Sequence, residues 1–133
     1  MEPLRKWDVL RVLPPGVGHP KYAVCICPVR FLFFYINSAP SFGRKRRSAC
    51  LVLPAYAATF LRKEESFLDT GDLVPLPGSV VETALADAAA RVGSLAPSLR
   101  ESTVALAARC GVLEPAELAI VVANETFVAS QPP

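Results

Sequence analysis

Residues 21–37 read KYAVCICPVRFLFFYIN and predict two β-strands joined by a short turn. Val, Ile, Phe, Tyr and Cys fill both ends of this stretch, and Pro28 and Arg30 interrupt it in the middle. The run 31–37 is almost continuously apolar, which is typical of a strand that is covered on both faces. In the run 21–29 the side chains alternate between two faces. One face is expected to carry Tyr22, Val24 and Ile26, and the other Ala23, Cys25 and Cys27.

Three further runs of strand-like composition flank this predicted hairpin. They are 7–13 (WDVLRVL), 48–54 (SACLVLP) and 65–76 (ESFLDTGDLVPL), the last bent near Gly71. Strands that follow one another this closely, without helices between them, favour a small antiparallel barrel or a rolled sheet.

After Gly78 the spacing of apolar residues changes to that of helices. Capping boxes, glycine stops and a proline suited to a first turn predict two or three short helices. The predicted signals are Ser79 with Glu82, Gly93, Ser98 with Glu101, Gly111 and Pro115.

We therefore predict a mainly β fold with α-helices. Residues 1–133 are expected to form a single domain, in which 1–78 make a small antiparallel barrel and 79–127 a helical C-terminal part. Residues 128–133, which end in SQPP, are expected to be a flexible tail.

The composition favours a folded domain outside the membrane. Of the 133 residues, 52% are hydrophobic, which argues against a disordered chain. No apolar run reaches the roughly 20 residues that cross a bilayer. The first residues, MEPLRKWD, are followed by no apolar signal region, so we expect no membrane association and a cytoplasmic location.

The four cysteines do not predict a disulfide framework or a zinc knuckle. None belongs to a C-x-x-C pair, so we expect buried free thiols and no metal or other cofactor. A thiol–metal site remains an alternative if Cys25, Cys27 and Cys50 meet, with His19 or Cys110 as the fourth ligand.

Charge is distributed unevenly along the chain. Residues 1–78 carry eleven Lys and Arg against six Asp and Glu, and residues 79–133 carry three against six. The first part is thus at +5 and the second at −3, within a total of +2. A basic first part is consistent with a polyanionic partner, although solvation alone also explains it.

Several of these segments resemble the PemK/MazF type of toxin. The residues that carry the resemblance are WDVLRV, the loop that opens into HPKYAVCI, the strand FLFFYINSAPS and the segment FLRKEESFLDTGDLVPL. The resemblance implies a compact SH3-like barrel with added helices and cleavage of single-stranded RNA without a metal. It also implies a homodimer with the RNA groove across its interface, and an antitoxin protein that neutralises it.

The sequence departs from the family pattern at three points. Lys21 stands where active members usually have an arginine, and Asn37 with Ser38 stands where they have a pair of hydroxyl residues. Asp69 and Asp72 have no adjacent arginine in the last strand. The chain is therefore either a divergent endoribonuclease or a catalytically inactive barrel that acts as a protein-interaction module in a phage or host-defence system.

A nuclease of this kind needs a proton donor and acceptor and cations for the phosphate. His19 is the candidate acid or base, Lys21 the phosphate-stabilising cation and Ser38 a hydrogen-bond donor. Arg62 and Lys63 are further candidates for phosphate binding. Each of these side chains also fits an ordinary surface position.

The run GRKRRS, residues 43–48, is the most basic in the chain and is predicted to be an exposed loop. Its four cations could bind RNA phosphates, contact an acidic antitoxin segment or simply keep the loop solvated. They are Arg44, Lys45, Arg46 and Arg47.

Overall fold

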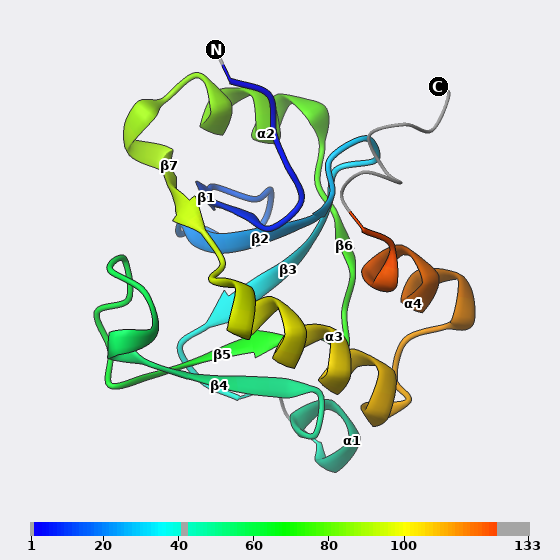
Figure 1. The fold of residues 1–133 in the computed structure, drawn as a ribbon. Helices are drawn as coiled ribbons and strands as arrows, with labels where there is room; N and C mark the ends of the chain where they lie inside the picture. Colours follow the sequence, from blue (N-terminus) through cyan, green and yellow to red (C-terminus); the bar gives the residue numbers. More distant parts are fainter. Residues whose placement is uncertain (1, 41–42, 125–133) are drawn as a thin grey trace.

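The computed structural model describes residues 2–40 and 43–124, and its centre is an antiparallel β-sheet (Figure 1). Along the sheet the strands run in the order β4-β5-β3-β2-β1-β7, and β6 pairs with β3 beside this path. The mainly β fold with helices is therefore confirmed. The strands are β1 (Asp8–Val12), β2 (Lys21–Cys27), β3 (Leu32–Asn37), β4 (Cys50–Pro54), β5 (Glu65–Asp69), β6 (Val74–Pro75) and β7 (Arg91–Ser94).

The central hairpin of β2 and β3 is buried on both faces, as its apolar composition predicts. On one face Val24, Ile26 and Phe34 pack with residues of the helices α3 (Pro97–Cys110) and α4 (Pro115–Val122). On the other face Ala23 and Phe33 pack with the helix α2 (Gly78–Leu85). Phe33 and Phe34 are both 0% exposed, so truncation of either to Ala is expected to cost about 3–5 kcal/mol.

The predicted run 65–76 forms two strands that both pair with β3. Ile36 lies opposite Leu68 of β5, and Phe33 lies opposite Val74 of β6. The chain turns between the two strands at residues 70–73, which confirms the predicted bend near Gly71.

The predicted faces of β2 are right up to Cys25 and wrong at Cys27. A β-bulge interrupts the pairing with β3 between these two cysteines. Because a bulge adds one residue on one strand, the alternation of faces is shifted after it. Cys25 therefore packs on the α2 side, whereas Cys27 packs on the opposite side with Val24 and Ile26.

The predicted helix that begins after Gly78 is shorter than expected, and its end was misplaced. It begins at Gly78 with Pro77 as the N-cap, so Ser79 lies inside the helix. It ends at Leu85, because the side chain of Asp87 accepts from the amide of Ala89 and starts a 3₁₀ turn, Ala88–Ala90.

Gly93 does not end a helix. It lies in the strand β7, which pairs with β1 next to a second irregularity of the ladder. The predicted helical part therefore also contains an edge strand, at the place where Gly93 was predicted to end a helix.

The third and fourth helices differ from prediction mainly at their starts. α3 begins with Pro97 after Ala96, so Ser98 is not its N-cap. Gly111 ends α3 with a φ of 68°, as predicted, and α4 begins at Pro115 as predicted. Its capping box consists of Glu114 and Glu117, which the usual Ser or Thr capping pattern does not predict.

The remaining helical segments are short. They are α1 (Arg44–Arg47) and a 3₁₀ turn, Ala55–Ala57. Within 2–40 and 43–124 no helix combines the length and the apolar character needed to cross a membrane. The predicted tail, 128–133, and the predicted end of the helical part, 125–127, lie outside the described residues.

Candidate functional site

A groove of about 580 Å³ opens where the loop before β2 meets the end of β3. The third wall comes from Leu61, Arg62 and Lys63, which precede β5, and from Ser66 within it. This arrangement follows from the hairpin, because the first residue of β2 and the last residue of β3 lie side by side. The groove brings together five of the nine predicted site residues: His19, Lys21, Ser38, Arg62 and Lys63.

All the formally charged residues in the described lining of this groove are cations. Its lining holds the cations Lys21, Arg62 and Lys63, and no Asp or Glu is among the described residues that line it. Arg62 and Lys63 are exposed at its rim. A concave surface with cations on several sides and no lining carboxylate favours a polyanionic ligand.

Lys21 is the most restrained of these cations. Its Nζ donates to Oδ1 of Asn37 at 2.7 Å and lies 4.6 Å from the centre of the Tyr35 ring. Partial burial lowers the pKa of the Lys21 ammonium, and the negative charge of Asp69 opposes this shift. On the neighbouring strand β3, partial burial and the charge of Asp72 raise the pKa of Tyr35.

His19 is exposed at the mouth of the groove. Its Nδ1 lies 3.1 Å from the carbonyl oxygen of Pro20. A proton on Nδ1 would donate to that carbonyl and leave the lone pair of Nε2 available for acid–base chemistry. Ser38, also exposed, contributes a hydroxyl to the same groove.

Two lining residues were not singled out from the sequence. Ser66 is 6% exposed and lies in the Ser66–Phe67–Leu68 segment that supports the family resemblance. Tyr22 lines the groove with its ring 5.0 Å from the ring of Phe60, at an angle of 51°. The alternation of β2 placed Tyr22 correctly on its face, but only the fold brings Phe60 next to it.

The basic run 44–47 forms the helix α1 and does not line the groove. Arg44 and Arg47 are exposed, and the side chain of Lys45 lies outside the described part of the structure. Arg46 forms ion pairs with Asp69 and Asp72, at 3.3 Å and 3.8 Å. Both aspartates thus pair with an arginine of α1, although no arginine is adjacent to either of them in the sequence.

The cysteines are free thiols in the described structure. Cys25 is fully buried, and burial raises the pKa of its thiol, which makes a nucleophilic thiolate there unfavourable. Among the residues in 2–40 and 43–124, no three His, Cys, Asp or Glu side chains come together in a way that could hold a metal ion.

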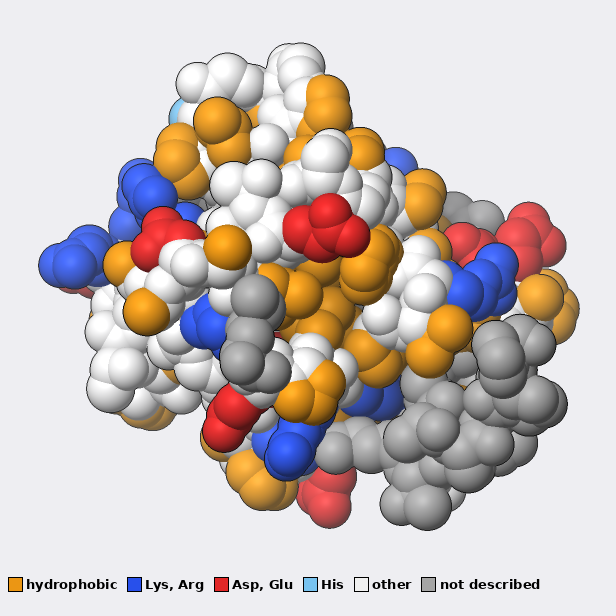
Figure 2. All heavy atoms as spheres, turned by 90° about the horizontal axis from the view of Figure 1, so that it is seen from above, with side chains coloured by type: hydrophobic (Ala, Val, Ile, Leu, Met, Phe, Trp, Pro, Cys, Tyr) orange, Lys and Arg blue, Asp and Glu red, His pale blue; other side chains and the backbone are white. Residues whose placement is uncertain are grey.

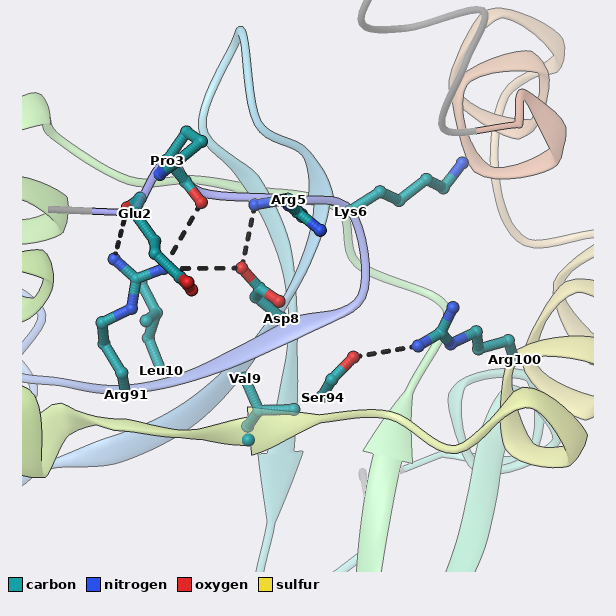
Figure 3. A pocket seen from close by; sticks show the side chains of 11 residues that line it. Glu2, Pro3, Arg5, Lys6, Asp8, Val9, Leu10, Arg91, Ser94 and Arg100 are labelled. Atoms are coloured by element: carbon teal, nitrogen blue, oxygen red, sulfur yellow. Dashed lines mark hydrogen bonds and ion pairs between the residues drawn. The ribbon is translucent and has the colours of Figure 1, made fainter.

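A second cavity, of about 590 Å³, lies between the N-terminal segment and β7, and Figure 3 shows its charged residues. Arg91 donates to the carbonyls of Glu2 and Pro3, at 2.7 Å and 3.3 Å, and lies 3.9 Å from Asp8. Arg100 donates to the carbonyl of Leu95 and to the hydroxyl of Ser94.

The charged residues of the second cavity thus have structural roles. The contacts of Arg91 hold the N-terminal segment against β7, and those of Arg100 hold the end of β7 against α3. The ammonium of Lys6 turns away from the cavity towards α4 (Figure 3). On the face that Figure 2 shows, Lys and Arg side chains form several separate groups among acidic ones, whereas the described lining of the groove holds three cations and no Asp or Glu.

No family model matches the chain, and the comparisons with curated proteins and with solved structures give no match either. The resemblance to PemK/MazF toxins therefore depends on the sequence segments alone.

Proposed function

We propose that this protein is a PemK/MazF-like, toxin-type protein that binds single-stranded RNA in the groove and cleaves it without a metal. One observation carries the proposal. The groove gathers three cations, the only histidine of the chain and two serines, with no carboxylate in its described lining.

The volume and the cations of the groove support the binding of RNA. A volume of about 580 Å³ lies within the range of small-ligand sites, which suits one nucleotide with its flanking phosphates. Lys21, Arg62 and Lys63 neutralise the phosphates, and this contribution weakens as salt is added. The ring of Tyr22 offers a surface on which a base stacks.

Cleavage uses the ribose itself as the nucleophile. The 2′-oxygen attacks the adjacent phosphorus, the 5′-oxygen leaves, and the products are a 2′,3′-cyclic phosphate and a 5′-hydroxyl. His19 performs one of the two proton transfers, taking the 2′ proton or supplying a proton to the leaving 5′-oxygen, and water performs the other. Lys21 and the hydroxyl of Ser38 stabilise the extra negative charge on the phosphorane oxygens.

The wider family features are part of the same proposal. They are an SH3-like barrel, a homodimer with the groove at its interface, an antitoxin partner and a location in the cytoplasm. The antiparallel sheet and the helices after it support the fold assignment. The exposed cations Arg44 and Arg47 offer α1 as a second contact for RNA or for an acidic antitoxin segment.

The test is incubation of the purified protein with a long single-stranded RNA in EDTA. Cleavage with cyclic phosphate or phosphate at the 3′ ends is expected, and it should be lost in His19→Ala and in Lys21→Met. Arg30→Met is the matched control. It removes an exposed cation at the other end of the same hairpin and should cleave like the wild type. Intact RNA at micromolar protein would refute the enzyme proposal.

The second candidate is a non-catalytic interaction module on the same fold. It is favoured by one observation, namely that the cation at the start of β2 is Lys21, whose ammonium is engaged by Asn37 and Tyr35. A lysine lacks the two-pronged donor geometry of arginine towards phosphate. RNA that remains intact, with no difference between the wild type and Lys21→Met, would favour this candidate.

A further inference from the structure

The ammonium of Lys21 is held from the neighbouring strand on two sides. Asn37 accepts its hydrogen bond at 2.7 Å, and the Tyr35 ring lies 4.6 Å away. Strand pairing explains why both contacts form. Tyr22 lies opposite Ile36 and Ala23 lies opposite Tyr35, so Lys21 and Asn37 both lie one position further, at the mouth of the hairpin.

Such restraint has a specific use in a lysine. Four rotatable bonds separate the ammonium from the backbone, and an unrestrained side chain loses conformational entropy when it binds a phosphate. The ammonium has three N–H donors, and Asn37 takes one of them. A donor therefore remains for a phosphate oxygen while the position of Nζ is already fixed.

Lys63 is a natural comparison within the same groove. It lines the groove as Lys21 does, but it is exposed, whereas Lys21 is half-buried between its two partners. If the groove binds phosphates, these two lysines should contribute in different ways. Lys63 should add charge, and Lys21 should add charge at a defined position.

We infer that Asn37 is a positioning residue, which holds Nζ of Lys21 ready for a phosphate oxygen of the RNA. This inference rests on the proposed function, because it assigns a role within the same groove. Asn37 itself does not contact the reacting atoms; it acts through Lys21.

The first experiment is a double-mutant cycle of RNA affinity. The ligand is a fluorescent single-stranded RNA with 2′-O-methyl riboses, which cannot be cleaved by attack of the 2′-oxygen. Lys21→Met and Asn37→Leu should each weaken binding roughly 3- to 10-fold. In the Lys21→Met background, Asn37→Leu should cause no further loss, because the side chain that it positions is gone.

The cycle separates the inference from the proposed function. If the wild type binds no RNA, the proposed function is refuted and the inference falls with it. If the wild type binds but Asn37→Leu causes the same loss in both backgrounds, or no loss at all, only the inference is overturned. Arg30→Met is again the control for loss of a cation outside the groove, and circular dichroism checks that each variant folds.

The second experiment needs no RNA. NMR relaxation of the ε-methylene groups should show Lys21 more ordered than Lys63 in the wild type and equally mobile in Asn37→Leu. Asn37→Asp keeps the acceptor but adds a negative charge, so Lys21 should stay ordered while RNA affinity falls. A Lys21 side chain as mobile as that of Lys63 in the wild type, or released in Asn37→Asp, would overturn the inference.

Discussion

Arg46 of α1 forms an ion pair with Asp69 at the end of β5, with 3.3 Å between Nη2 and Oδ2. The Asp69 side chain is only 7% exposed and also accepts from the amide of Gly71 at 2.9 Å. Asp72 lies 3.8 Å from the same guanidinium, but its side chain is 57% exposed. The two aspartates therefore differ in what they contribute, although both face Arg46.

Asp69→Asn is expected to lower the free energy of unfolding by about 1–2 kcal/mol. The amide keeps the size of the side chain but loses the charge-assisted bond to Arg46, and the half-exposed guanidinium limits the loss. Urea denaturation measures the change. Asp72→Asn is the matched control, and it should change stability by less than about 0.5 kcal/mol. Equal losses in the two variants would contradict this assignment.

Lys6 stabilises the end of α4 from the N-terminal segment. Its buried ammonium donates to the carbonyls of Ile120, Val121 and Ala123 and lies 5.5 Å from the Trp7 ring. These are carbonyls that a helix end leaves without partners, at its negative pole.

Lys6→Met should therefore lower the free energy of unfolding by about 2–3 kcal/mol, because buried carbonyls lose a charged donor. The measurement is again a urea titration of the full chain. Arg5→Met changes the neighbouring exposed cation and should stay within about 0.5 kcal/mol of the wild type. A Lys6→Met protein as stable as the wild type would show that α4 does not need this contact.

Gly71 lies where the chain leaves β5, and there is little room for a side chain. A Cβ atom would meet Ala49 Cβ at 3.1 Å, Val112 Cγ1 at 3.2 Å and Asp69 Oδ1 at 3.3 Å. Gly71→Ala should lower the midpoint of thermal unfolding, by an overpacking cost of about 1–2 kcal/mol. Gly78→Ala is the control, since its Cβ would meet only Phe31 at 3.7 Å, and it should be neutral or slightly stabilising. A similar shift for both would mean that the neighbours of Gly71 yield easily.

The sequence predicted the elements whose signal is local. The run 31–37 is apolar at nearly every position because β3 has a core on both sides, and Pro115 begins α4 because proline fits a first turn. β7 was missed because Arg91–Ser94 holds one large apolar residue, and its strand conformation depends on pairing with β1. The changed face of Cys27 depends on a bulge, which the alternation of residue types does not reveal.

In the candidate site, too, some contacts could be predicted from local sequence and others depend on tertiary packing. Lys21 and Ser38 come together because adjacent strands of a hairpin meet at their ends, and this could be foreseen once the hairpin was predicted. The approach of residues 61–63 to the end of the hairpin and the pairing of Arg46 with Asp69 join segments far apart in the chain. Such contacts are set by tertiary packing, and neither segment carries a residue pattern that specifies its partner.

The buried thiol of Cys25 should make the protein less stable at alkaline pH. Its pKa is raised above the ordinary value of 9.0 by burial and by the charges of Asp8 and Cys27. In the unfolded chain the thiol loses its proton above about pH 9, while in the folded protein it keeps it. The folded state therefore binds more protons in this range, and stability falls as pH rises, by up to about 1.4 kcal/mol per pH unit.

Cys25→Ala should remove this contribution, so its stability should fall less steeply with pH above 9 than that of the wild type. Urea denaturation at several pH values under reducing conditions measures the slope. The variant is expected to be less stable overall because it leaves a small cavity, but that loss does not depend on pH. Cys50→Ala controls for the removal of a thiol elsewhere. An unchanged slope in Cys25→Ala would contradict the prediction.

The groove cations should be visible in the salt dependence of RNA binding. Each phosphate contact with a single strand contributes about 0.7 to the slope of log affinity against log salt concentration. Arg62→Met and Lys63→Met should each reduce the slope by about this amount, and the double variant by about twice as much, because both side chains line the groove.

Fluorescence anisotropy between roughly 50 and 300 mM salt measures the slopes. Arg109→Met removes an exposed cation from the last turn of α3 and should keep the wild-type slope. If Arg109→Met lowers the slope as much as the groove variants do, the RNA binds by overall charge and the groove is not its site.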